Sequence, residues 1–176
     1  DIFHAIYKDA QFRDNPFAFV YPPTERQDAG YFQRWEYSLN QPETFELARE
    51  LRTIADGYSP PRLLIGEVFG SDDVIRRFLG EQLDGLNLAF LWNLLRLKMN
   101  AGTLREVIRH HEAHYPEPYT PVYVLGNHDT RRVMSNIGNN VRLAKLLALF
   151  QFTVRGIPVT YYGDEICYVN GLRYAR

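Results

Sequence analysis

Two carboxylate residues stand near the ends of apolar runs, and this position makes them candidates for chemistry. Glu67 lies in the run 63–69, and Asp129 closes the run 122–129. Such runs are typical of buried parallel strands, where a carboxylate is costly to bury without a partner or a task. In barrels and doubly wound sheets, catalytic and ligand-binding residues lie at the carboxyl ends of the strands. Glu67 and Asp129 could therefore face one pocket.

The first residue, Asp1, precedes a segment with helical spacing. Apolar residues at positions 2, 3, 6 and 7 predict a helix over about 2–9. From the residues alone, the ordinary interpretation of Asp1 is a helix N-cap. The amino terminus has neither an initiator Met nor a basic signal-peptide start, so we expect the chain to begin within a longer protein.

The rest of the sequence predicts helices and strands in alternation, after a long ordered loop over 12–41 that is rich in aromatic residues, Pro and Gly. The predicted elements are a helix opening at Pro42 with Asn40 as its cap, a strand to Glu67, a helix capped by Ser71 or Asp72, a strand over 86–90, a helix from Thr103, a strand over 121–125, a helix over 139–154 and a strand over 157–162.

This alternation predicts an α/β fold with a parallel sheet, either an open doubly wound sheet or a (β/α)8 barrel. A whole barrel needs about 250 residues. The composition does not change along the sequence in a way that would mark a second domain, and the sequence contains no internal repeat. We therefore expect a single, partial domain over 1–176.

The composition excludes several classes of protein. Hydrophobic residues make up 45% and charged residues 23%, which is typical of a globular protein. The formal net charge of -1 without a basic run offers no surface for nucleic acid or an anionic membrane. No apolar segment reaches the ~18–20 residues of a membrane span. The single cysteine, Cys167, excludes internal disulfides and a Cys-rich zinc site.

Three histidines near one another also suggest a metal. His110 and His114 would share a helix face, beside His111, but the order His-Glu-Ala-His misses the zinc motif His-Glu-x-x-His. No further ligand is evident. We expect a surface helix here and no metal site.

Ordered motifs in the chain resemble those of the α-amylase family of glycoside hydrolases, in particular bacterial α-glucosidases and oligo-1,6-glucosidases. They are the segment from Asp1 to Pro16, Gly66-Glu67-Val68-Phe69 and Gly126-Asn127-His128-Asp129. The segment 156–166 is similar to the family's eighth barrel strand. The resemblance implies a partial (β/α)8 TIM barrel, from roughly the end of strand 4 through strand 8.

The resemblance also implies a role for each candidate residue. Asp1 matches the nucleophile, Glu67 the general acid/base, and Asp129 the carboxylate that stabilises the transition state. His128 matches a histidine that holds sugar hydroxyls, and Arg132 an arginine that pairs with an aspartate in the sugar pocket of exo-acting members. Retaining glycoside cleavage agrees with these roles, because it needs one ionised carboxylate to attack and one protonated carboxyl group to donate.

The implied activity is retaining hydrolysis of short α-glucosides from the non-reducing end, through a covalent glucosyl-enzyme. The implied partner is an oligosaccharide or α-glucoside, with no cofactor in this segment and a calcium ion only in an amino-terminal half of the barrel. One alternative is a transglucosylase or sucrose isomerase of the same family. Another is a non-catalytic amylase-fold interaction protein, but such proteins usually lose the carboxylates that this chain keeps.

The sequence departs from the family pattern in two places. The family's first motif and the arginine two residues before the nucleophile belong upstream of Asp1, and Cys167 replaces a usual glycine. Simpler interpretations also remain: Glu67 or Asp129 could form an ordinary ion pair with a nearby arginine, and His128 could be structural. The loop aromatics could line a sugar site or only pack the loop; they are Phe17, Phe19, Tyr21, Tyr31, Phe32 and Trp35.

Overall fold

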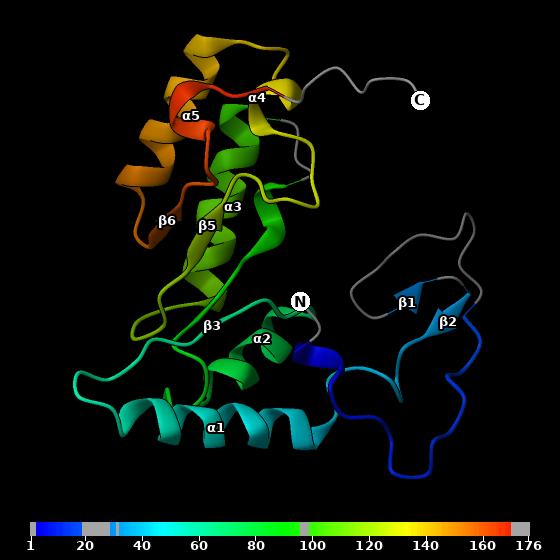
Figure 1. Ribbon diagram of the computed structural model, residues 1–176. Coiled ribbons are helices and arrows are strands. Elements are labelled where there is room, and N and C mark those ends of the chain that lie inside the picture. Colours follow the sequence, from blue (N-terminus) through cyan, green and yellow to red (C-terminus); the bar gives the residue numbers. More distant parts are fainter. Residues whose placement is uncertain (1–2, 19–28, 31, 96–98, 170–176) are drawn as a thin grey trace. The chain divides into compact units, whose positions relative to one another are not determined.

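A computed structural model describes residues 3–18, 29–30, 32–95 and 99–169 (Figure 1). The chain forms two compact units, Asp1–Ala89 and Phe90–Arg176. Among these residues, each unit contains one pair of parallel strands. The single domain expected over 1–176 stays a prediction. Among the described residues, no helix combines the length and apolar character needed to cross a lipid bilayer.

In the first unit, two helices accompany a short parallel strand pair (Figure 1). Its elements are η1 (Phe3–Ala5), β1 (Ala29–Gly30), β2 (Gln33–Arg34), α1 (Pro42–Asp56), β3 (Ile65–Gly66), α2 (Asp72–Leu79) and β4 (Leu88–Ala89). β3 pairs with β4 in parallel, with Ile65 opposite Leu88. The buried rings of Phe45 on α1 and Phe78 on α2 lie 4.5 Å apart between centroids. These aromatic contacts join the two helices.

The predicted helix over 2–9 is only one 3-10 turn, η1. This turn ends at Ala5, and after it the Oδ2 of Asp9 accepts the backbone N–H groups of Gln11 and Arg13, both at 3.2 Å. Such bonds from a side chain to nearby backbone compete with helix formation. The chain therefore turns early into the long loop, where β1 and β2 form a two-residue antiparallel ladder.

Capping of the two helices agrees with the sequence in one case only. The Ser71 hydroxyl accepts the N–H of Val74 at the start of α2, as predicted. At the start of α1 the N-cap residue is Gln41, so the prediction of Asn40 is wrong. Asn40 instead adopts a left-handed backbone, with φ of 54°, and its side chain makes a contact distant in sequence. Asparagine tolerates this conformation better than most residues.

The strand before Glu67 is shorter and more exposed than predicted. Leu63 and Ile65 are 60% and 51% exposed, whereas Gly66 and Val68 are buried. Successive side chains on a strand point to opposite faces. Glu67 therefore shares its face with the two exposed apolar residues. The prediction of a fully buried strand is wrong here, because the described residues of this unit cover only the opposite face.

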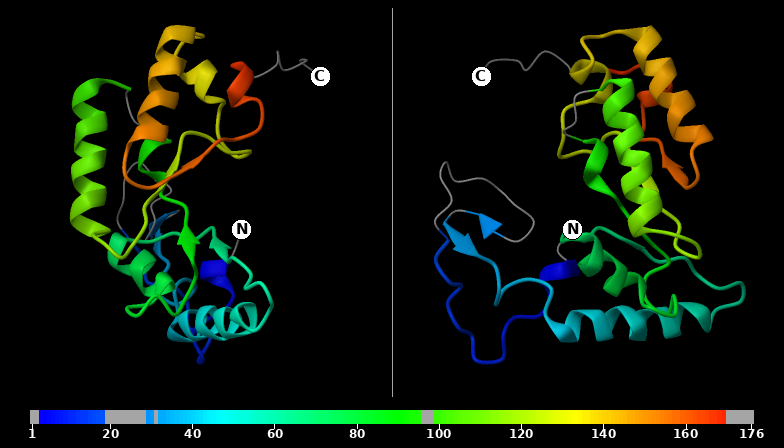
Figure 2. Two further views of the ribbon diagram at one scale, coloured as in Figure 1. Left: turned by 90° about the vertical axis from the view of Figure 1, so that its left-hand side faces the viewer. Right: turned by 180° about the vertical axis from the view of Figure 1, so that it is seen from behind.

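The second unit surrounds a parallel pair with helices (Figures 1 and 2). Its elements are η2 (Trp92–Leu94), α3 (Ala101–His114), β5 (Val122–Val124), α4 (Val133–Asn136), α5 (Val141–Thr153), β6 (Ile157–Val159) and η3 (Asp164–Ile166). Tyr123 on β5 lies opposite Pro158 on β6, and Leu91 forms a further parallel bridge with Tyr123. The predicted parallel pairing is therefore confirmed in both units.

An apolar core holds β5 in place, as predicted for a buried strand. Its buried members are Leu94, Val107, Tyr123, Leu125, Val133 and Leu147. One buried polar side chain joins them: the Nε2 amide of Gln151 on α5 donates to the carbonyls of Tyr123 at 2.7 Å and Val159 at 2.9 Å. Gln151 thus ties α5 to both strands.

Asparagine caps set the starts of α3 and α5. Asn100 accepts the N–H of Thr103 at 3.0 Å and Asn140 that of Leu143 at 3.1 Å. α3 therefore begins at Ala101, two residues before the predicted start.

The predicted surface helix is α3, most of whose residues are exposed or half-buried, but one of its three histidines, His111, is buried. This residue is only 1% exposed, its ring lies 4.8 Å from that of Tyr123, and its Nε2 lies 3.1 Å from Asn93 Oδ1. The rings of His110 and His114 stack on one another at 4.2 Å. His111 faces the core because it lies one helix turn from the buried Val107.

Candidate active site

The predicted site residues lie in both units. Glu67 follows β3 in the first unit, and His128, Asp129 and Arg132 follow β5 in the second. Asp1 lies outside the described residues. The convergence of Glu67 and Asp129 on one sugar would join the two units, and it stays a prediction.

Glu67 is half-buried at the carboxyl end of β3. The residue before it, Gly66, allows close packing, because a Cβ at that position would overlap the side chain of Leu86. Glu67 lies on the exposed face of the strand, and the next residue, Val68, is fully buried. A carboxyl group in this position can exchange a proton with a bound molecule.

Asn40 anchors the segment that follows Glu67. Its Nδ2 donates to the carbonyl of Phe69 at 3.1 Å, and its backbone N–H donates to the carbonyl of His4 at 2.7 Å. The ring of His4 meets that of Phe69 edge-on, with centroids 5.1 Å apart. Burial lowers the pKa of His4 below its ordinary value of 6.5, so the ring is neutral at pH 7. One asparagine thus links the segment after Asp1 to the segment after Glu67.

His128 and Asp129 lie in an exposed turn after β5. Their side chains are 64% and 63% exposed, and His128 Nε2 lies 3.4 Å from Asp129 Oδ2. Asn127 shapes this turn: its Oδ1 accepts the N–H of Asp129 at 3.2 Å, and its own N–H donates to Thr130 Oγ1 at 3.1 Å. Asn127 was not predicted as a site residue, although an asparagine two residues before Asp129 is a common turn signal.

Arg132 is buried, with only 7% exposure, inside a cage of aromatic rings. Its guanidinium carbon lies 4.3 Å from the ring centroid of Tyr161, 4.5 Å from that of Tyr162 and 5.0 Å from that of Tyr168. Its Nη1 also donates to the carbonyl of Tyr162. A planar guanidinium can stack on rings and donate in its plane at the same time.

The charge of Arg132 is matched by Asp164, whose Oδ1 lies 3.8 Å from Nη1. Burial raises the pKa of Asp164 above its ordinary value of 3.8, and the charge of Arg132 opposes this effect. The aspartate partner that the resemblance implies lies upstream of Asp1, and that pairing stays a prediction. Asp164 and the three tyrosines around Arg132 were not predicted as site residues, although all four lie within eight residues of sequence.

Comparison with known proteins gives one family and several relatives. A family model described as "Alpha amylase, catalytic domain" matches residues 2–174. A salivary alpha-glucosidase of Anopheles gambiae is 28% identical over 177 residues, which cover 96% of this chain and 29% of that protein. A cyclomaltodextrinase of Geobacillus thermopakistaniensis (strain MAS1) is 31% identical over 144 residues, which cover 78% of this chain and 24% of that protein.

Solved structures share the fold. An alpha-glucosyl transfer enzyme, XgtA, superposes with a TM-score of 0.79 at 24% identity, over 96% of this chain and 32% of that one. The trehalose-6-phosphate hydrolase TreA of Bacillus licheniformis gives a TM-score of 0.74 at 19% identity, over 97% of this chain and 31% of that one. The chain thus spans less than a third of the length of each of these relatives.

Proposed function

The chain belongs to the alpha-amylase catalytic-domain family, and from that premise we propose that it is part of a retaining glycoside hydrolase. Its substrates are short oligosaccharides, cut at α-glucosidic bonds from the non-reducing end. The observation that carries this proposal is the placement of Glu67 and Asp129, each after a strand of a parallel pair, in a chain matched by the family along 2–174. Relatives named alpha-glucosidase and maltase support the substrate class.

The proposed architecture is half of a (β/α)8 barrel, from the end of barrel strand 4 through barrel strand 8. In this arrangement β3, β4, β5 and β6 are consecutive barrel strands. The parallel pairings of β3 with β4 and of β5 with β6 support it. Parallel strands of a barrel present their carboxyl ends on one rim, where catalytic residues gather.

In the proposed mechanism, the carboxylate of Asp1 attacks the anomeric carbon while Glu67 protonates the departing glycosidic oxygen. The product is a covalent glucosyl-enzyme and a released sugar. Glu67, now ionised, then takes a proton from water, which displaces Asp1 and releases glucose. This retaining route places the two carboxyl groups about 5–5.5 Å apart. Asp129 stabilises the positive charge of the transition state, His128 binds sugar hydroxyls, and Arg132 pairs with an aspartate in the sugar pocket.

Transfer to a sugar instead of water is the second candidate function, because it uses the same intermediate. The structural likeness to XgtA, an alpha-glucosyl transfer enzyme, favours it. A non-catalytic interaction protein is the weaker candidate, because Asp1, Glu67 and Asp129 are all present.

The test is a pair of substitutions in the full-length protein, assayed on a nitrophenyl α-glucoside and on maltose. Glu67→Gln should lower kcat/KM on maltose by about 10²–10⁴-fold, the usual contribution of a general acid. Glu50→Gln, at an exposed position on α1, is the matched control and should retain full activity. Near-normal turnover of maltose by Glu67→Gln, with the fold intact by circular dichroism, would refute the assignment.

A further inference from the structure

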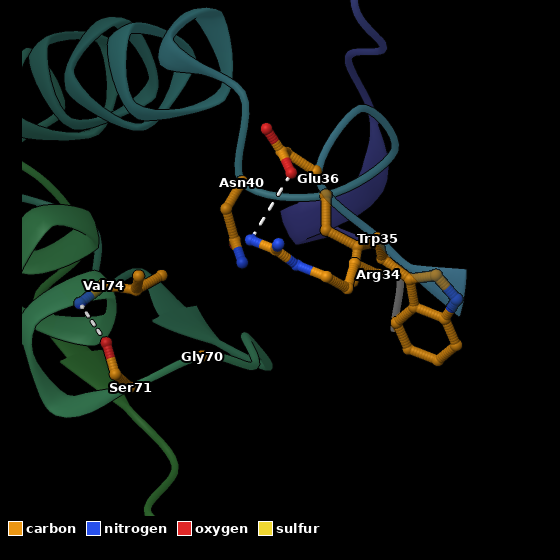
Figure 3. A pocket seen from close by; sticks show the side chains of 8 residues that line it. Arg34, Trp35, Glu36, Asn40, Gly70, Ser71 and Val74 are labelled. Atoms are coloured by element: carbon orange, nitrogen blue, oxygen red, sulfur yellow. Dashed lines mark hydrogen bonds and ion pairs between the residues drawn. The ribbon is translucent and has the colours of Figure 1, made fainter. Parts of the chain in front are cut away.

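Two places outside the proposed catalytic residues could hold a small ligand. One is a pocket of about 450 Å³ in the first unit, lined by Arg34 and Glu36 among other residues (Figure 3). Arg34 Nη2 lies 3.5 Å from Glu36 Oε2, so the charges of its walls compensate each other and indicate no ligand class. The other place is a pair of histidine rings on α3, His110 and His114, whose nitrogens indicate a metal ion.

The rings of His110 and His114 stack toward the end of α3, with centroids 4.2 Å apart and planes 27° from parallel. Residues at positions i and i+4 of a helix lie on one face, one turn apart. Both residues are half-buried, so each ring is restricted by its surroundings and still borders the solvent. The helix therefore holds two imidazoles together before any ligand binds, which lowers the entropic cost of binding.

A hydrogen bond to the backbone sets the tautomer of His114. Its Nδ1 lies 2.9 Å from the carbonyl oxygen of His110, and a carbonyl can only accept, so Nδ1 carries a proton and donates it. In the neutral ring the other nitrogen, Nε2, then keeps a lone pair. Metal-binding histidines almost always donate their second ring nitrogen to a carboxylate, a backbone carbonyl or water, which orients the ring and raises its basicity as a ligand. His114 already makes this supporting contact.

The separation of the ring nitrogens suits one ion. One nitrogen of His110 and one nitrogen of His114 lie within 4.8 Å of each other. Two Zn–N bonds of about 2.0–2.1 Å at a tetrahedral angle span about 3.3 Å, so a rotation of one ring brings both nitrogens onto the ion. Imidazole nitrogens suit Zn²⁺ and its neighbours among the transition metals, whereas Ca²⁺ and Mg²⁺ prefer oxygen ligands.

The charges around the two rings also favour a cation. The carboxyl end of a helix carries a partial negative charge, and both histidines lie in the last two turns of α3. Glu106, which is exposed one turn before His110, adds a carboxylate to the same helix face. Arg109 is exposed, and successive helix residues do not face each other, so its charge can stay in the solvent.

We propose that His110 and His114 form a binding site for a divalent transition-metal ion of the Zn²⁺ class, with water in the remaining coordination positions. The ion links two successive turns of α3 and stabilises the end of the helix. The motif His-Glu-x-x-His, which the sequence lacks here, provides the general base of a metalloprotease as well as two ligands. An ion that only binds needs the two nitrogens alone. The proposal is independent of the glycosidase function.

The experiment is calorimetric titration of the full-length protein with ZnCl₂, in the presence of excess Ca²⁺ to fill oxygen-lined sites. His110→Phe keeps a ring in the stack but removes its nitrogens. It should weaken Zn²⁺ binding by at least about tenfold, because even the loss of a contact that supports a ligand costs 10–100-fold in affinity. His114→Gln should have the same effect and decides the matter if His110→Phe does not fold by circular dichroism.

His128→Phe is the matched control, because it removes an exposed histidine outside the pair and should leave the Zn²⁺ affinity unchanged. Amide hydrogen exchange locates the ion: Zn²⁺ should increase protection over residues 110–115 in the unaltered protein and not in His110→Phe. Equal Zn²⁺ affinity of the unaltered protein and both pair variants would overturn the proposal. A loss of binding in His128→Phe alone would overturn it too, since the ion would then lie beside Asp129.

Discussion

In the first unit, polar side chains hold the backbone around Glu67, whereas in the second unit an apolar core holds the strand before Asp129. Asn40 fixes Phe69 through one amide hydrogen bond, and Ile65 beside Glu67 is 51% exposed. On β5, by contrast, Tyr123 is 2% exposed and packs in the core.

The two kinds of support differ in how much free energy they contribute and in how narrowly they define the geometry. A single hydrogen bond adds about 0.5–1.5 kcal/mol net, but it fixes a donor and an acceptor in one geometry. A buried aliphatic side chain contributes about 1.5–3 kcal/mol by leaving water, with little directional preference. We therefore expect changes in an apolar core, such as that around β5, to lower stability most, and changes of polar contacts beside Glu67 to act mainly on position.

The largest expected effect is in the core of the second unit. Leu147→Ala should lower the free energy of unfolding by about 2–5 kcal/mol, because Leu147 is 1% exposed and its loss leaves a cavity. Leu146→Ala, the same change one residue earlier at 60% exposure, should stay within about 0.5 kcal/mol. Urea unfolding of the two variants in the full-length protein measures the difference. Equal losses would contradict a core-supported β5.

The next largest effect is expected at Arg132, inside its cage of aromatic rings. Arg132→Lys should lower stability by about 1–3 kcal/mol, because an ammonium cannot stack on rings and donate in one plane. It should also weaken turnover of short substrates if Arg132 closes the sugar pocket. Arg131→Lys, at an exposed neighbouring position, is the control. Internal cleavage of long starch by the unaltered enzyme would show that the pocket is not closed.

A smaller effect is expected at Asn40. Asn40→Gly keeps the left-handed backbone but removes the bond to Phe69, so it should cost about 1 kcal/mol. Asn139→Gly changes an exposed asparagine with φ of 59° and should stay within about 0.5 kcal/mol. Thermal unfolding and kcat should be measured together. If the two variants behave alike, Asn40 does not anchor the segment after Glu67.

The smallest expected effect is the pH dependence of stability, which we expect to have opposite signs in the two units. Hydrogen bonds from Arg13 lower the pKa of Asp9 from 3.8 to about 2. The ionised Asp9 therefore stabilises the folded state above pH 3.8, and this contribution is lost as the pH falls toward about 2. The lowered pKa of His4 likewise removes stability as pH falls below 6.5. The raised pKa of Asp164 acts the other way: between its folded value and 3.8, acidification favours the folded state.

Amide hydrogen exchange, followed by peptide in each unit as pH is lowered, measures these contributions. Protection near Asp9 should decline as pH falls from 3.8, and Asp9→Asn should remove that part of the decline. Asp164→Asn should remove the opposing trend in the second unit. The same pH dependence in both units would contradict the contrast between them.

The sequence alone determined the alternation of helices and strands from α1 onward, except for the short α4, together with the parallel direction of the β3–β4 and β5–β6 pairs and the residue types at the strand ends. These features follow from local rules: apolar periodicity, caps such as Ser71, and breakers such as Gly57 after α1. Glu67 and Asp129 could also be identified as candidate site residues without the structure, because each lies at or near the end of an apolar run in the sequence.

Only the tertiary structure decided how these residues are supported. Asn40 left its predicted capping position because its partner, the Phe69 carbonyl, lies 29 residues away. The Arg132 guanidinium donates to the Tyr162 carbonyl, 30 residues away, and the ring of the buried His111 contacts Asn93, 18 residues before it. A polar side chain that becomes buried must form a hydrogen bond, so its position depends on which partner the folded chain brings near it. That choice depends on segments far apart in the sequence, which local patterns do not encode.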